Sequence, residues 1–103
     1  MILSDEKGNL RIGLVMEGGP VLALADEIGK PRATLVVGDN GPELSMSDEN
    51  GRRRVLLCAL KEGGVGLDLF DENGKPRTGM ATGKGGPRLT LRDENGKVIW
   101  SAR

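Results

Sequence analysis

The sequence contains no histidine, no tyrosine, one cysteine, one phenylalanine and one tryptophan. Without histidine, a serine or cysteine nucleophile lacks its usual base, and a zinc ion lacks its commonest nitrogen ligand. Cys58 lies inside the apolar run 56–60, which predicts a buried and inert thiol. A lone cysteine cannot form an intrachain disulfide and is typical of a reducing compartment, so we expect a cytoplasmic location.

An excess of charge of one sign and long apolar runs are also missing. The 15 basic and 15 acidic residues cancel, whereas a nucleic-acid-binding protein usually carries a basic stripe. The triplet Arg52–Arg54 is expected to be a solvated strand edge rather than a phosphate site. No apolar stretch reaches 18 residues, and the first residues lack a basic segment followed by an apolar one. We therefore expect no nucleic-acid partner, no membrane partner and no signal peptide.

The scarcity of aromatic residues limits the core that one chain can build. We expect one domain over residues 1–103, which at this size buries only about 60–65% of the surface of its unfolded chain. The 17 glycines add an entropic cost on ordering. These features predict a chain that is marginally stable alone and that buries more surface by association.

A repeat of roughly 22 residues accounts for nearly the whole chain, and its copies start near positions 1, 22, 44, 67 and 89. Each copy has an alternating apolar segment, then Asp-Glu-x-Gly, then a second apolar segment. The first four copies close on a glycine-rich link. Three residues after the glycine stands an arginine in four copies and Ile99 in the fifth; the arginines are Arg11, Arg32, Arg54 and Arg77.

Two short apolar runs around a polar turn with glycine are typical of a β-hairpin. Helices are excluded because glycine and proline interrupt the chain before any segment reaches helical length. The sequence thus predicts an all-β protein, an antiparallel meander of about five tandem hairpins. The sheet would be prism-, sandwich- or barrel-like and completed by oligomerisation, because an apolar face must meet another layer.

The repeated turn admits two conformations. Asp at the first and Gly at the fourth position favour a type I turn closed by a glycine bulge. A type I′ turn would place Ile28 at positive φ, where a β-branched residue is strained, so we expect the bulge turn. With the bulge turn, Leu69 faces Arg77 across the hairpin, and both sheet faces carry apolar residues; the type I′ turn would gather them on one face.

No motif for catalysis or binding stands out against this turn chemistry. Asp-x-Asn-Gly has its glycine two places too early for an EF-hand loop. The link Gly83–Gly86 lacks the Gly-Lys-Ser/Thr sequence and the helix that a phosphate-binding loop requires. Phe70 and Trp100 occupy different positions in their repeats, so no sugar-stacking site repeats, and Trp100 is expected to plug one end of the core. We expect no catalytic, cofactor-binding or metal-binding residues.

The pattern Leu-x-Leu-x-Asp-Glu-Asn-Gly-Lys-x-Arg is complete from Leu67 to Arg77. It resembles hairpin repeats in uncharacterised bacterial proteins and looks similar to the repetitive shafts of trimeric phage or surface fibres. The resemblance covers nearly the whole chain and implies a repeated β fold but no activity. The fibre resemblance implies a virion or surface location as the alternative to a cytoplasmic one.

These observations predict a structural or interaction module without enzymatic activity, whose partner is itself. A trimeric prism, in which each chain supplies one wall, is the first expectation. A dimer of sheets is the second, and a monomeric barrel or sandwich is the third. The alternative function is a small-molecule or carbohydrate-binding module of lectin type, and a hydrolase built on paired carboxylates ranks behind it.

Overall fold

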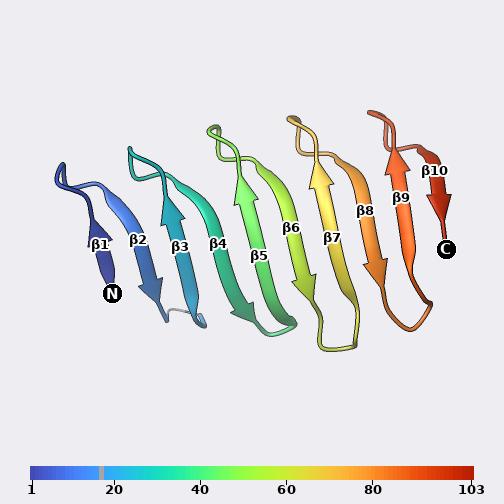
Figure 1. Cartoon of the computed structure of the whole chain (residues 1–103), viewed down its shortest axis with the longest axis horizontal. Coiled ribbons are helices and arrows are strands. Elements are labelled where there is room, and N and C mark those ends of the chain that lie inside the picture. The colour runs from blue at the N-terminus through green and yellow to red at the C-terminus, as the bar shows by residue number, and fades with distance from the viewer. Residues whose placement is uncertain (17) are drawn as a thin grey trace.

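The chain forms one open sheet of ten antiparallel strands, paired in sequence order (Figure 1). The computed structural model describes residues 1–16 and 18–103. The strands are β1 (Ile2–Ser4), β2 (Leu10–Val15), β3 (Val21–Ala25), β4 (Pro31–Gly38), β5 (Gly41–Ser47), β6 (Arg53–Ala59), β7 (Val65–Phe70), β8 (Pro76–Thr82), β9 (Arg88–Arg92) and β10 (Val98–Ala102). The predicted all-β meander of hairpins is confirmed.

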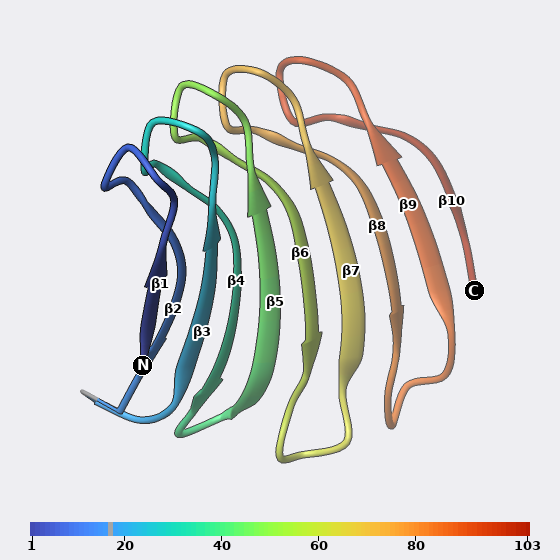
Figure 2. The same cartoon turned by 60° about the vertical axis from the view of Figure 1, so that its left-hand side comes forward.

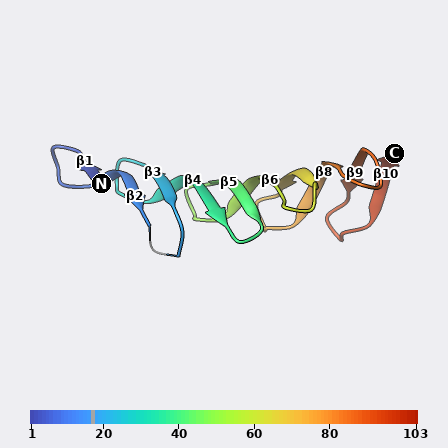
Figure 3. The ribbon, with the colours of Figure 1, turned by 90° about the horizontal axis from the view of Figure 1, so that it is seen from below.

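The sheet is a single layer and does not close on itself. It measures 49 × 29 × 15 Å, and the edge strands β1 and β10 lie at its two ends (Figure 1). Seen from below, the strands follow one another in one thin row with no second layer (Figure 3). The third expectation, a barrel or sandwich made by one chain, is therefore wrong for this chain, because its strands pair only with their neighbours in sequence.

The five Asp-Glu-x-Gly turns lie along one edge of the sheet and the links along the other (Figure 1). In every turn the Gly N–H donates to the Asp carbonyl at 3.0 Å, and the Asp N–H donates to the carbonyl four residues on at 2.9 Å. The five turn glycines have φ between 84° and 88°, and no other type of residue in the described ranges has positive φ. The predicted type I turn with a glycine bulge is confirmed, with Ile28 in an unstrained conformation.

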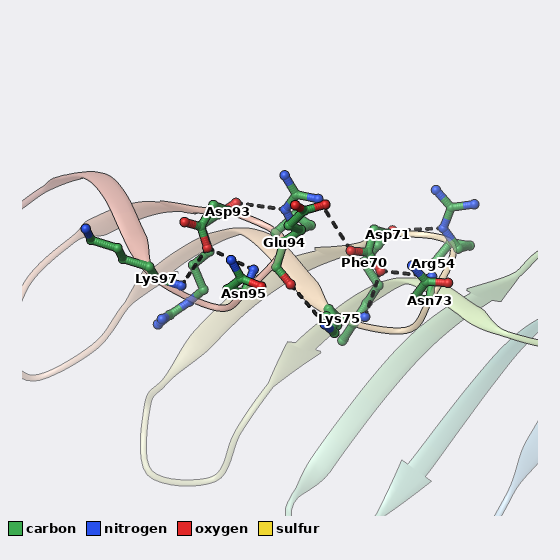
Figure 4. Close-up of polar contacts among 11 residues, drawn as sticks. Arg54, Phe70, Asp71, Asn73, Lys75, Asp93, Glu94, Asn95 and Lys97 are labelled. Atoms are coloured by element: carbon green, nitrogen blue, oxygen red, sulfur yellow. Dashed lines mark hydrogen bonds and ion pairs between the residues drawn. The ribbon is translucent and has the colours of Figure 1, made fainter.

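One carboxylate oxygen organises each turn. Asp71 Oδ1 accepts the N–H of Asn73 at 2.9 Å and the N–H of Lys75 at 3.0 Å (Figure 4). The other four turns repeat both bonds within 2.9–3.1 Å. An aspartate at this position satisfies two backbone donors that the turn leaves free, which explains why all five copies carry it.

A second bulge in each hairpin corrects the expected arrangement of the faces. Leu69 pairs with Thr78 but Phe70 pairs with Pro76, so Arg77 is an extra residue without a partner on β7. The same one-residue shift occurs at Arg11, Arg32, Arg54 and Ile99. The prediction that Leu69 faces Arg77 is wrong, because this shift moves the second strand's side chains across the sheet. Apolar residues do occur on both faces, as predicted, but in unequal number.

As a result the large apolar side chains gather in three rows on one side of the sheet, here called the leucine face. Paired residues share a face and alternate residues return to it. The middle row runs from β2 to β9 through Leu14, Leu22, Leu35, Leu44, Leu57, Leu67, Met80 and Leu89. The row beside the turns is Leu3, Ile12, Leu24, Ala33, Met46, Val55, Leu69, Thr78, Leu91 and Trp100. The row beside the links includes Val37, Pro42, Ala59, Val65 and Thr82.

The opposite face is built from smaller and more polar residues. Its central row is Gly13, Ala23, Thr34, Ser45, Leu56, Asp68, Gly79, Thr90 and Ser101. Cys58 lies on this face, paired with Glu43 and Gly66, and is only half-buried. The expectation of a buried thiol is therefore wrong, since a single-layer sheet leaves both of its faces accessible.

Among the described residues no apolar side chain is buried. Leu57, in a central strand of the leucine face, keeps 42% of its surface exposed, and Met80 keeps 52%. Trp100 stands in the row position of Ile12, as the repeat predicts, but it is 49% exposed. It plugs no core within one chain, because one chain has no second layer to form a core.

Replacing Gly74 by valine is expected to lower the free energy of unfolding by about 1 kcal/mol or more, because a β-branched residue is strained at positive φ. Gly74 has φ +85° and open space around its Cβ position, so the loss isolates backbone strain. Gly85 also has open space but no positive φ, which makes Gly85→Val the matched control. Urea unfolding measures both; equal stabilities of the two variants would contradict the bulge turn.

Candidate interaction surface

An arginine joins each hairpin to the next one along the chain. The Nε–H of Arg54 donates to the carbonyl of Phe70, the residue before the next turn, at 2.8 Å (Figure 4). The three other junctions repeat this bond at 2.8–3.1 Å, as Arg11 to Ala25, Arg32 to Ser47 and Arg77 to Arg92. The bulge residue of one hairpin therefore holds the neighbouring hairpin at a fixed offset.

The same arginines also contact the aspartates of their own turns. Arg77 Nη1 lies 3.4 Å from Asp71 Oδ2, and the pairs Arg11–Asp5, Arg32–Asp26 and Arg54–Asp48 lie at 3.6–3.7 Å. Asp71 thus accepts backbone bonds with one oxygen and faces an arginine with the other. Each aspartate–arginine pair links turn formation to the alignment of successive hairpins.

A second set of contacts runs between the tips of the turns. Lys75 Nζ donates to the carbonyl of Glu94 at 3.0 Å (Figure 4). Equivalent bonds join Asn9 to Glu27, Lys30 to Glu49 and Arg52 to Glu72. The residue after the turn glycine therefore serves as a donor to the next turn in four copies, a role that requires a polar or basic side chain.

Together these bonds form a ladder along the turn edge, here called the arginine ladder. The arginines keep about two fifths of their side-chain surface exposed, so each ion pair is weak. The ladder bonds instead determine geometry. The same contacts recur at four junctions, so each hairpin is displaced from the preceding one in the same way. The strands stay close to parallel from β1 to β10 (Figure 1) and bend in the same sense (Figure 2). Such untwisted sheets are unusual and depend on side-chain ladders or stacking.

The turn environment lowers the pKa of several aspartates. The N–H of Arg52 lowers the pKa of Asp48 despite partial desolvation, and the charge of Arg54 adds to it. The N–H of Lys75 does the same for the pKa of Asp71, with Arg77 as the charged partner. For Asp26, partial desolvation raises the pKa, but backbone donors and Arg32 outweigh it and the net shift is downward.

The leucine face is the most extensive candidate surface. Its three rows are about 20 Å wide at roughly 7 Å per row. Along the 49 Å sheet they cover on the order of 1,000 Å², against about 300–600 Å² for the largest apolar patch of a typical monomer. No charged residue occurs in these rows. Near the N-terminal end the face is hollowed between Met1, Leu14, Leu22, Leu35 and Val37.

The other sequence candidates do not assemble into a chemical site. The Asp Oδ1 atoms of the Asp-x-Asn-Gly turns are engaged by backbone donors, and the described residues hold no group of three or more His, Cys, Asp or Glu placed for a metal. The link Gly83–Gly86 is a turn closed by the bond from Gly86 N–H to the Gly83 carbonyl. Phe70 on β7 and Trp100 on β10 are three strands apart.

Sequence reasoning missed the function of the arginines. The triplet Arg52–Arg54 is solvated, as expected, but it does not lie at a sheet edge, because β6 is an interior strand and two of the three arginines donate to the next hairpin. The signal that could have revealed the ladder was present: an arginine recurs three residues after the turn glycine in four of the five copies.

No protein-family model matches the sequence, and no curated protein matches it. Where the structure describes the chain, it contains no helix with the length and apolar character needed to cross a bilayer.

Replacing Arg54 by methionine removes its bond to the Phe70 carbonyl and its contact with Asp48. We expect a loss of about 0.5–1.5 kcal/mol in the free energy of unfolding, the typical net contribution of one hydrogen bond. Arg53→Met is the matched control, since Arg53 is the exposed neighbour that pairs opposite Ser47 and takes no part in the ladder. Equal losses in denaturant titrations of the two variants would contradict the ladder.

Acid should weaken the fold through the turn aspartates. Because the pKa of Asp71 is lowered in the folded state, its contribution is fully present above the ordinary carboxyl pKa of about 3.9 and is lost as pH falls below it. Asp71→Asn keeps an oxygen acceptor but cannot titrate. We expect this variant to lose less stability than the parent between about pH 4 and pH 2, measured by chemical unfolding at each pH. Parallel pH profiles would refute this role of Asp71.

Proposed function

We propose that this chain is a structural, self-assembling module without catalytic activity, and that the leucine face is its interaction surface. The observation that carries the proposal is the exposure of three continuous apolar rows on one side of a single-layer sheet. A sheet that is apolar on one face must bury that face against another layer. One chain supplies no such layer, so the layer comes from another molecule.

The unequal composition of the two faces supports the same conclusion. The central row of the opposite face contains glycine, alanine, serine, threonine and Asp68, with Leu56 as its large apolar member. A face of this kind can stay in water, whereas the middle row of the leucine face is seven leucines and one methionine. The centre of one face is therefore strongly apolar and the centre of the other is more polar, which suits a wall of a larger assembly.

Binding of a small polar molecule or sugar is the second candidate function, and a hollow near the C-terminal end favours it. Asp68, Phe70, Arg92 and Asn95 line this hollow, and an adjoining one contains Gly79, where the Asp68 carboxylate lies 3.2 Å from the position a Cβ would take. An aromatic ring beside carboxylate and amide groups is a common composition for sugar sites. A saturable, ligand-induced rise in melting temperature that Asp68→Asn abolishes would favour this function over the scaffold.

A lysine at Leu57 is expected to dissociate the assembly, because it places a charge in the middle of the leucine face between Leu44 and Leu67. Leu56→Lys is the matched control, since Leu56 is the adjacent residue of β6 and points to the opposite face between Ser45 and Asp68. Light scattering on a size-exclusion column should show a smaller species, or aggregation, for the first variant and the parental mass for the second. Equal masses for all three proteins would refute the assignment of the interface.

A further inference from the structure

We propose that the leucine face of one chain packs against the leucine faces of two further copies, an inference that rests on the proposed self-assembly. Three chains would form a three-walled prism whose long axis runs perpendicular to the strands. Each chain supplies one wall, the middle rows meet at the axis, and the turn edge of each wall adjoins the link edge of the next. The inference goes beyond a general interaction surface because it fixes the partner, the number of copies and their orientation.

The distribution of side-chain size across the leucine face favours converging walls. The middle row contains only leucine and Met80 on the eight interior strands. The row beside the links is small, with Val37, Ala59 and Thr82 among its members. Two parallel sheets keep a uniform gap of about 10 Å and need similar side chains in every row. In a prism the gap is widest at the centre of a wall and closes toward the corners, which matches a large middle row with a small row beside the links.

The width of the face fits the same arrangement. A triangular prism with walls about 20 Å wide has its axis about 6 Å from each wall, close to half of the roughly 10 Å between packed sheets. Leucine side chains from three walls can therefore reach the axis and leave little empty space. Wider walls would leave a channel, and narrower walls would leave no room for the middle row.

The two edges of the sheet are complementary in size. In a three-fold arrangement every corner brings the row beside the turns of one chain against the row beside the links of another. The row beside the turns carries large residues on alternate strands, namely Leu24, Met46, Leu69 and Leu91. The row beside the links offers valine, proline, alanine and threonine. Large side chains then pack against small ones at the corners, where the space is narrowest.

The low twist of the sheet allows the contact to continue along the whole molecule. Ordinary sheets rotate by about 20–25° per strand, which over ten strands would turn the apolar rows away from a common axis. Here the strands stay close to parallel from β1 to β10 (Figure 1). A row that remains straight over the 49 Å length can meet its equivalents in two other chains at every level.

The number of copies is tested by the native mass of the full chain, measured by light scattering on a size-exclusion column. The prism predicts about 33 kDa for three copies of the 10.9 kDa chain. A stable dimer would overturn the prism while leaving the proposed self-assembly intact. A monomer that persists at high concentration would overturn both, so the two failures are distinguishable.

The orientation of the copies is tested with spin labels on exposed turns. Glu6→Cys and Glu94→Cys, each in a Cys58→Ala background, place labels at the two ends of the sheet without removing any ladder bond. A three-fold axis keeps the copies parallel, so both variants should give label-to-label distances below about 35 Å. Distances well above about 40 Å in both variants would mean antiparallel copies and would overturn the prism even if the mass were correct.

Discussion

The structure depends on a carboxylate that accepts two backbone N–H groups, repeated five times. In each turn this aspartate fixes a tight reversal that a positive-φ glycine completes. Its second oxygen faces the arginine of the same hairpin in four of the copies. That arginine donates to the next hairpin, so a local turn preference is converted into the spacing of the whole array. Individually weak, exposed bonds are effective here because every junction uses the same geometry.

The paired bulges decide which surface the molecule presents. The glycine bulge alone would split the apolar residues between the two faces, and the extra residue at the arginine position returns them to one face. Function and stability are therefore linked through register: the residue that carries the arginine ladder also creates the leucine face. A sheet whose strands are kept in one repeating offset by such a ladder can pack along its full length against equivalent sheets.

The repeat, the all-β meander and the turn type follow directly from the sequence, because aspartate, glycine and Ile28 constrain the turn locally. The arrangement of the faces does not follow, since it depends on a second bulge three residues after each turn glycine, at Arg11, Arg32, Arg54, Arg77 and Ile99, which the turn sequence does not specify. The absence of any buried apolar side chain in the described chain also follows only from the open, single-layer shape. Composition predicted a small core, whereas one chain alone has none.

The central claim is that the leucine face is covered by other copies of the chain, so that folding and association are coupled. Stability must then depend on protein concentration, because association draws the equilibrium toward the folded form. The most direct test is the thermal or urea unfolding midpoint over a hundredfold range of concentration. The account predicts a midpoint that rises steadily with concentration, and a midpoint that stays constant over that range would contradict it.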